Sequence, residues 1–141
     1  MSFLLDTNVV SEWVKPQPSA NVCRWLTHAD EDDLYLSVVT IGELRFGIER
    51  LAAGARRDRL RSWVEDDLPA RFDARILVID LPTADLWGRL MAKARAVGRP
   101  VAAVDTLIGA TAERHGLTVV TRNTGDFASL GIRILDPWHI V

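Results

Sequence analysis

Residues 3–14, FLLDTNVVSEWV, begin with a short apolar run and continue in a segment with a helical pattern. Asp6 ends the apolar run, so we predict a buried strand over residues 3–6. A short helix is predicted from about Asn8 to Val14, because the Lys15-Pro16-Gln17-Pro18 sequence that follows cannot continue it. A buried strand followed at once by a helix is the unit from which α/β folds are built.

The same alternation of apolar runs and helical segments continues along the chain. Runs rich in branched residues, without strict alternation, are typical of strands covered by helices on both faces. We therefore predict an α/β fold, an α/β/α sandwich in which a mainly parallel five-stranded sheet is flanked by helices. The predicted strands cover residues 3–6, 34–38, 76–79, 118–121 and 133–135.

Helix signals fill most of the segments between these strands. Thr40 is predicted to cap a helix in which Glu43, three positions on, completes a capping box, and Gly54 is predicted to end it. Pro69 marks an end or a kink in a polar helical segment over residues 56–72. Further helices are predicted from Ser19 to about Ala29, from Pro82 towards Gly98 and from about Ala103 to His115.

The composition is that of an ordinary globular protein. With 141 residues, 48% of them hydrophobic and 26% charged, the chain suits one domain over residues 1–141. No apolar run approaches the roughly 18–20 residues that span a bilayer, and the first residues lack the basic region of a signal peptide. Cys23 is the only cysteine, so no internal disulfide is possible. These features favour a cytoplasmic protein with no membrane contact.

The formal net charge of −2 limits how the chain can contact nucleic acid. A protein that holds a long nucleic-acid backbone is usually basic, so any such contact is expected to be local and short. Arginine and lysine gather over residues 56–61 and 89–99. The simplest interpretation of both runs is a solvated helix face.

Four acidic residues are distinguished by their positions. Asp6 ends the first predicted strand, Glu43 lies near the start of the helix after the second, and Asp126 follows the fourth. Open α/β sheets bind ligands outside the carboxyl ends of their strands, so these three are expected at one edge. Asp105 joins them if its helix begins at that edge.

Carboxylates gathered in this way favour a divalent cation. Alone they would repel one another and their pKa values would rise, whereas a cation makes the ionised forms ligands. Hard oxygen donors suit magnesium, with manganese as a substitute. Such a site can orient and hydrolyse a phosphodiester. The chemistry needs no catalytic histidine, and the three histidines of the chain show no motif spacing.

Each acid also has a purely local interpretation. Asp6 fits a helix cap, Glu43 the capping box, and Asp105 a favourable charge near a helix start. Asp126 fits turn chemistry after Gly125. The occurrence of all four at one predicted edge favours the functional interpretation.

Small polar residues accompany the acids. Thr7 and Asn8 can donate hydrogen bonds that fix Asp6, and Thr121 and Asn123 can do the same near Asp126. Asn8 and Asn123 are also ordinary cap and turn residues, so both interpretations stay open. Arg122 is a further candidate for phosphate contact, although a surface role is simpler.

These residues carry a resemblance to a known family. Residues 4–8 (LLDTN), 37–44 (SVVTIGEL), 105–112 (DTLIGATA) and 120–127 (VTRNTGDF) resemble the four ordered motifs of PIN-domain nucleases. Length and the Pro137-Trp138 ending resemble bacterial VapC toxins, including their FitB-like branch. The resemblance implies a magnesium-dependent endoribonuclease, dimerisation and neutralisation by a cognate antitoxin. It also implies that Asp6, Glu43, Asp105 and Asp126 surround the metal, with Asp6 and Asp105 the most direct ligands.

Two function classes follow. The first is a toxin ribonuclease that cleaves single-stranded regions of RNA. The second is a regulatory subunit that contacts DNA only through its antitoxin, with the acidic site not its main activity. A dehalogenase-type phosphatase is disfavoured because Asn8 stands where its second acid is needed, and a receiver domain because no lysine follows Lys93.

The chain contains five tryptophans, at positions 13, 25, 63, 87 and 138. Aromatic residues are enriched in interface cores, although most buried tryptophans serve packing. If some form a groove among the first helices, an amphipathic antitoxin segment is expected to lie in it. An antitoxin arginine that reaches the acids would block the site by charge pairing.

Overall fold

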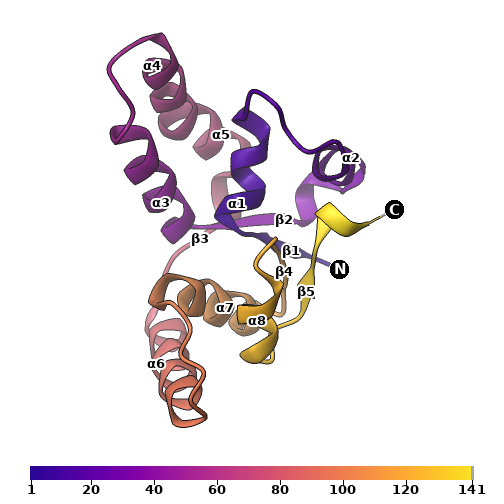
Figure 1. Ribbon diagram of the computed structural model, residues 1–141, viewed down its shortest axis with the longest axis vertical. Helices are drawn as coiled ribbons and strands as arrows, with labels where there is room; N and C mark the ends of the chain where they lie inside the picture. The colour runs from indigo at the N-terminus through magenta and orange to yellow at the C-terminus, as the bar shows by residue number, and fades with distance from the viewer. Residues whose placement is uncertain (141) are drawn as a thin grey trace.

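The computed structural model describes residues 1–140 and contains a five-stranded sheet in the order β3-β2-β1-β4-β5. Every neighbouring pair of strands is parallel, which confirms the predicted α/β class (Figure 1). The strands are shorter than predicted: β1 (Phe3–Leu5), β2 (Leu34–Ser37), β3 (Ile76–Leu77), β4 (Thr118–Val120) and β5 (Ile134–Leu135).

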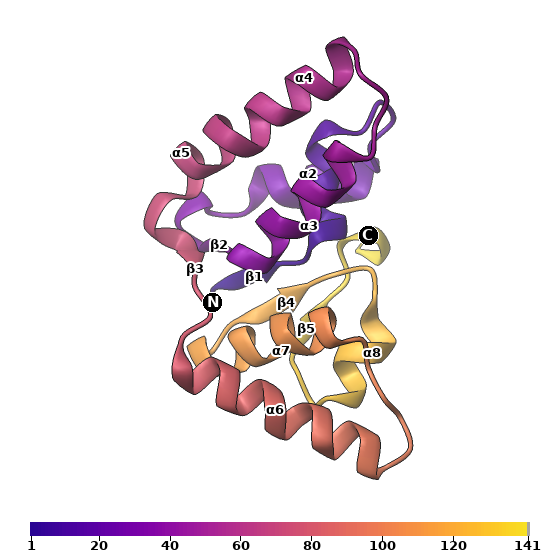
Figure 2. The same cartoon turned by 90° about the vertical axis from the view of Figure 1, so that its left-hand side faces the viewer.

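Helices cover both faces of the sheet, as the sandwich prediction requires. The helices α1–α5 lie on one side and α6–α8 on the other (Figure 2). They are α1 (Thr7–Val10), α2 (Ala20–His28), α3 (Val38–Glu49), α4 (Ala55–Ser62), α5 (Leu68–Phe72), α6 (Leu81–Ala96), α7 (Ala103–His115) and α8 (Thr124–Ser129). Short turns of helix complete the set: η1 (Ser11–Val14), η2 (Glu31–Asp33), η3 (Trp63–Asp67), η4 (Asp73–Arg75) and η5 (Pro137–His139).

The two central strands divide their side chains between two hydrophobic cores. Leu5 and Val120 pack with α1–α3 and α5, whereas Leu4 and Val119 pack with α6–α8, and all four are fully buried. Successive side chains of a strand point to opposite faces, so an apolar run without alternation is what a doubly covered sheet needs. The buried centre of the sheet thereby fixes the carboxyl ends of β1 and β4 side by side.

The predicted boundaries of the third helix are wrong at both ends. Ser37, not Thr40, caps α3, because β2 runs directly into the helix and the Ser37 hydroxyl accepts from the Val39 N–H at 3.1 Å. Thr40 is therefore inside the helix and buried. The helix ends at Glu49, and Gly54 precedes the first residue of α4.

The polar segment predicted to be helical over residues 56–72 is helical, with an interruption before Pro69. The π-helical turn η3 separates α4 from α5, and the Leu68 N–H bonds the Trp63 carbonyl five residues back. Proline has no N–H with which to continue the regular ladder, so Pro69 sits in the first turn of α5, where the lack costs least. The kink that Pro69 predicted is thus a change of helical register.

Two further observations complete the fold. The short helix α8, after β4, was not predicted, and it carries Asp126 in its first turn. Among residues 1–140, no helix combines the length and the apolar character that a membrane crossing would require.

Candidate active site

Four separate segments bring the predicted acids to the carboxyl edge of the sheet. Asp6 directly follows β1 and caps α1, and Glu43 lies in the second turn of α3. Asp105 and Asp126 lie in the first turns of α7 and α8. The open question about Asp105 is resolved, because α7 begins at this edge and Asp105 shares a hydrogen-bond donor with Asp126.

Asp6 is the most enclosed of the four acids, with only 4% of its surface exposed. Its Oδ1 accepts from the Thr7 N–H at 2.8 Å, and its Oδ2 accepts from the Thr121 hydroxyl at 2.8 Å and the Asn8 amide at 3.3 Å. Burial raises the pKa of Asp6, these hydrogen bonds oppose the rise, and the charge of Glu43 adds to it. The Asp6 carboxylate is therefore fixed in position but electrostatically disfavoured.

Glu43 is tied to the same segment through one threonine. The Thr7 hydroxyl donates to Glu43 Oε1 at 2.6 Å, and it lies 3.3 Å from the Thr40 hydroxyl. The predicted capping box between Thr40 and Glu43 is therefore wrong, because Glu43 is too far into α3 to reach the helix start. Thr7 serves two acids at once, through its backbone N–H to Asp6 and its hydroxyl to Glu43.

Asp105 and Asp126 are linked by a single amide. Asn123 Nδ2 donates to Asp105 Oδ2 and to Asp126 Oδ2, each at 3.0 Å. Burial raises the pKa of Asp105 to about 6, and the charges of Asp6, Glu43 and Asp126 contribute to the rise. That three other carboxylates act on Asp105 shows that the four acids share one electrostatic site.

The four supporting residues predicted from the sequence all contact the acids. Thr121 connects the two halves of the site, because its hydroxyl donates to Asp6 and accepts from the Asn123 N–H at 2.9 Å. The Asn8 carbonyl oxygen accepts from the Arg122 N–H at 3.3 Å. Neutral donors therefore form a continuous hydrogen-bonded frame from Thr7 to Asn123. Such a frame holds carboxylates in place while leaving their charge uncompensated.

The chemistry of the donor set fits a divalent cation. The four side chains supply only hard carboxylate oxygens, and their mutual repulsion is what a positive ion would relieve. As they stand, no three acidic, histidine or cysteine side chains within residues 1–140 enclose a common point as a metal site would. The four acids form an anionic site whose carboxylate oxygens would be the ligands of a cation.

Two features of this region go beyond the residues assigned from the sequence. Glu12 is buried, and its carboxylate lies 2.6 Å from Lys15 Nζ. A groove of about 290 Å³ begins at Thr7 and Glu43 and extends between η1, α3 and α4 as far as Trp63. The sequence predicted a groove among the first helices only in general terms, from the tryptophans, because its walls come from segments distant in the chain.

Comparison with known proteins identifies the class to which this fold and site belong. Residues 3–132 match the model of the PIN domain, so the chain belongs to the PIN-domain family. The ordered acids, the all-parallel sheet and the family match agree with one another.

Within that family, the chain is similar to toxins of toxin–antitoxin systems over nearly its whole length. It is 40% identical over 136 residues to Toxin FitB of Neisseria gonorrhoeae, covering 96% of this chain and 98% of FitB. It is 38% identical over 136 residues to VapC ribonuclease Y4jK of Sinorhizobium fredii, covering 96% and 97%. A structure of FitAB bound to an IR36 DNA fragment matches with a TM-score of 0.93 and 38% identity, covering 99% of this chain and 97% of that one.

Proposed function

We propose that this protein is the toxin of a type II toxin–antitoxin pair and a metal-dependent endoribonuclease that cleaves single-stranded regions of RNA. The observation that carries the proposal is the convergence of four carboxylates at one edge of the sheet. Burial, together with the charges of the other three carboxylates, raises the pKa of Asp105 to about 6. A protein keeps such a costly arrangement where a cation and an anionic substrate are to be handled. The names of the relatives, a toxin and a VapC ribonuclease, support the same assignment.

The ion assigned to the site is Mg²⁺, with Mn²⁺ as a substitute. Asp6 and Asp105 are the proposed direct ligands, and the carboxylates of Glu43 and Asp126 complete the metal site. When bound, the ion would polarise the phosphodiester and stabilise the leaving oxygen. Oxygen-only donors and the absence of a softer side chain among these four residues favour Mg²⁺ over zinc.

The chain's own residues prepare the site for that ion. Thr121 and Asn8 hold Asp6 Oδ2, and Asn123 holds Asp105 and Asp126 at equal distances of 3.0 Å. Because these donors are neutral, they orient the carboxylates without cancelling the charge that attracts the cation. The positions of the ligands are therefore set before the ion arrives, which reduces the ordering cost of binding.

The remaining assignments follow from the same function. We assign residues 1–141 to a single PIN domain that acts in the cytoplasm as a homodimer. A cognate antitoxin neutralises it, and contact with DNA is made only through that antitoxin. The net charge of −2 agrees with a protein that itself binds a short stretch of RNA rather than long duplex DNA.

The test is cleavage of a mixed panel of single-stranded and structured RNAs by purified protein freed of antitoxin. Reactions contain Mg²⁺, Mn²⁺ or EDTA, and the variants Asp6→Asn and Asp105→Asn run alongside. The matched control is Asp85→Asn, on α6, whose carboxylate is exposed and paired with Arg89. We expect metal-dependent cleavage by the parent and by Asp85→Asn only. Equal cleavage by all proteins would show a contaminating nuclease and refute the assignment.

A second candidate function is transcriptional regulation together with the antitoxin. It is favoured by one observation, the close match to a structure of FitAB bound to a DNA fragment. Gel-shift titration of the promoter region with the toxin–antitoxin complex tests it. Promoter binding by the complex, with no RNA cleaved by the free folded toxin, would place regulation first.

A further inference from the structure

The groove that begins at the acidic site is longer than the hollow beside Glu43. A second hollow of about 520 Å³ shares Val14, Arg56, Leu60 and Trp63 with the first, so the two adjoin. We call the two adjoining hollows together the α3–α4 groove. It runs from Thr7 and Glu43, past η1, to the outer end of α4. Its volume is in the range of sites that hold small ligands.

The lining of the α3–α4 groove is apolar with a cationic rim. Leu44, Ile48 and Leu60 supply aliphatic surface, and Trp63, which is partly exposed, supplies an aromatic ring. The rim carries three exposed cations, which are Lys15, Arg56 and Arg59.

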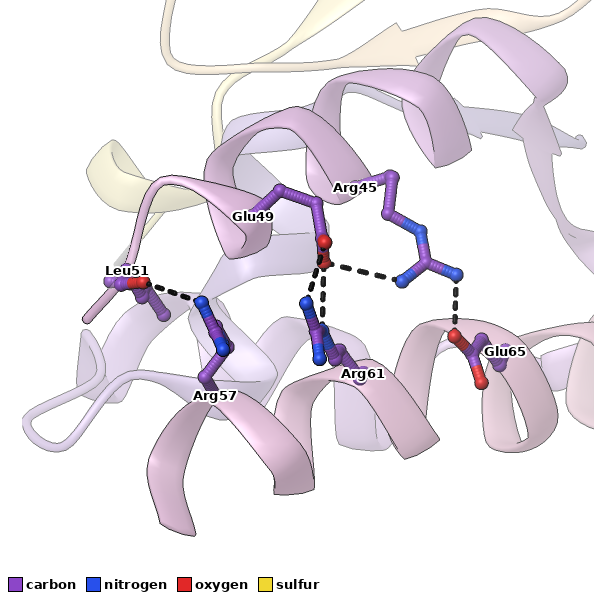
Figure 3. Close-up of polar contacts among 6 residues, drawn as sticks. All are labelled: Arg45, Glu49, Leu51, Arg57, Arg61 and Glu65. Atoms are coloured by element: carbon purple, nitrogen blue, oxygen red, sulfur yellow. Dashed lines mark hydrogen bonds and ion pairs between the residues drawn. The ribbon is translucent and has the colours of Figure 1, made fainter. Parts of the chain in front are cut away.

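Arginines on the same two helices differ in whether they have acidic partners. Arg61 pairs with Glu49 and connects α4 to α3, whereas Arg45 pairs with Glu49 on its own helix and with Glu65 of η3 (Figure 3). Within residues 1–140, neither Arg56 nor Arg59 has a carboxylate oxygen within 4.0 Å. The paired arginines hold α4 against α3, and the unpaired ones keep their charge available at the groove.

Lys15 differs from the two arginines because a buried residue fixes its position. Glu12 is 2% exposed, accepts from the Ser19 N–H at 2.9 Å and lies 2.6 Å from Lys15 Nζ. An ammonium group has three N–H donors, so donors remain for a second anion after the pairing with Glu12. Lys15 is thereby held on the groove between the acids and Arg56.

We propose that the α3–α4 groove holds the single-stranded RNA next to the phosphodiester that is cut, with one base stacked on Trp63 and backbone phosphates at Lys15 and Arg56. This inference rests on the proposed ribonuclease function and adds a substrate-binding surface to it. Aromatic rings that stack bases, combined with cations that follow the backbone, are the usual means of binding single strands. Glu43, one of the four acids, and Thr7, which bonds both Asp6 and Glu43, line one end of the groove, so a strand seated in it reaches the active site.

Charge favours RNA over a purely apolar protein segment as the occupant, and the amphipathic antitoxin segment expected from the sequence is the alternative that the experiment tests. A purely apolar helix would leave the unpaired guanidinium of Arg56 without a counter-ion, whereas a phosphate would pair with it in bidentate fashion. The chain as a whole is slightly acidic, so cations concentrated beside the acids mark where a polyanion can be tolerated. The experiment below treats a protein occupant as an outcome that overturns the inference.

The test measures the affinity of the free toxin for short fluorescein-labelled single-stranded RNAs of mixed sequence, by anisotropy in EDTA so that no cleavage occurs. We expect Trp63→Ala to weaken binding about tenfold, because one stacked base contributes on that order. Trp63→Phe keeps an aromatic face and is expected to retain most of the affinity. Arg56→Gln is expected to weaken binding several-fold and to reduce the slope of log K against log salt by about 0.7.

Controls separate this inference from the proposed function. Arg95→Gln removes an exposed arginine on α6, on the other face of the sheet, and is expected to bind like the parent. Thermal melts of each variant identify any loss of fold. If Trp63→Ala is unfolded, the affinities of Trp63→Phe and Arg56→Gln are used to judge the inference. Parent-like RNA affinity in Trp63→Ala and Arg56→Gln would overturn the inference and leave the groove to a protein partner. Mg²⁺-dependent cleavage by the parent, absent in Asp105→Asn, would still support the ribonuclease.

Discussion

The acidic site and the ion pairs of α3 and α4 differ in whether a carboxylate has a positively charged partner. On the surface, Glu49 accepts from Arg61 at 2.7 and 2.9 Å and lies 3.4 Å from Arg45 (Figure 3). Hydrogen bonds from Arg61 hold the pKa of Glu49 below its usual value. At the sheet edge, Asp6 and Asp105 have only neutral donors, and burial raises the pKa of each.

The difference separates charges that support the fold from charges that serve a ligand. Glu49 is exposed, paired and stable as an anion, so it has no need of a further cation. Asp105 is half-buried among three like charges, so its ionisation costs free energy that a bound cation would offset. Paired surface charge therefore indicates a structural role, and unpaired charge that the fold holds in place indicates a binding role.

The largest effect is expected when an acid of the site loses its charge. Asp6→Asn removes a proposed ligand while keeping the shape, so RNA cleavage is expected to fall by about a hundredfold to ten-thousandfold, the equivalent of several kcal/mol. Glu49→Gln is the matched surface change and is expected to leave the rate unchanged. Initial rates on one labelled RNA in Mg²⁺ measure both. A similar loss of cleavage rate in Asp6→Asn and Glu49→Gln would show that the acids of the site are no more important for cleavage than a paired surface acid.

A smaller loss is expected when the frame is altered and the charge is kept. Thr121→Val removes the hydroxyl that donates to Asp6 at 2.8 Å, and residues in this position typically contribute 10–100-fold to metal affinity or activity, so we expect about that loss. Thr118→Val, at the start of β4 three residues before Thr121 and also buried, contacts none of the four acids through its side chain and serves as the control. Mn²⁺ titrations measure the affinity. An unchanged titration of Thr121→Val would show that the frame does not position the ligands.

Removing the charge of Asp105 is expected to stabilise the metal-free protein. Because its pKa of about 6 in the fold lies above the 3.8 of an ordinary aspartate, the carboxyl favours folding below about pH 4, and this contribution is lost as the pH rises through about 6. At neutral pH the ionised group therefore opposes folding. We expect Asp105→Asn to raise the free energy of unfolding by about 1–2 kcal/mol, after allowance for solvent screening.

Urea unfolding of the parent and Asp105→Asn in EDTA, between pH 4 and pH 8, measures that difference. The gap between the two proteins is expected to widen as the pH rises through about 6. A less stable Asp105→Asn at neutral pH would contradict the electrostatic account of the site.

The smallest effect is expected at the surface ion pairs. Glu49→Gln breaks the contacts with Arg45 and Arg61, and exposed pairs of this kind contribute little to stability, so only a small loss is expected. High salt screens such pairs, so the difference from the parent is expected to shrink as salt is added. Urea unfolding at low and high salt measures it. A cost that persists in high salt would mean that these charges act through packing rather than pairing.

The central strands and the edge positions of Asp6, Glu43 and Asp126 were predictable because local chemistry determines them, whereas the position of Asp105 depended on where α7 begins. The apolar run before Asp6 is short, ends in an acid and is followed by a helix, so its place at the carboxyl edge follows from α/β topology alone. The supporting residues were predictable because Thr7 and Asn8 are adjacent to Asp6 in the chain. Their exact partners were not, since the Thr7 hydroxyl bonds Glu43 from another segment.

Features that depend on distant segments were mispredicted or missed. Ser37 and Thr40 are both good caps, and only the end of β2 decides that Ser37 is used. The six residues of α8 are too few to give a periodic signal. The α3–α4 groove forms where η1 meets α3 and α4, so Lys15 and Trp63 become neighbours of the site only after folding.

The π-helical turn η3 separates the helix that lines the groove from the helix that packs in the core. Before the turn, α4 contributes no buried residue and carries the groove-lining Arg56, whereas after it α5 places Leu68 and Phe72 in the core. A π turn is one extra residue accommodated within a helix, so each side keeps its own angular phase. Substitutions in α4 can therefore alter what the groove accepts without rotating the core residues of α5. Related proteins with this fold can in this way differ in the residues that line the groove while the four acids at the sheet edge stay the same.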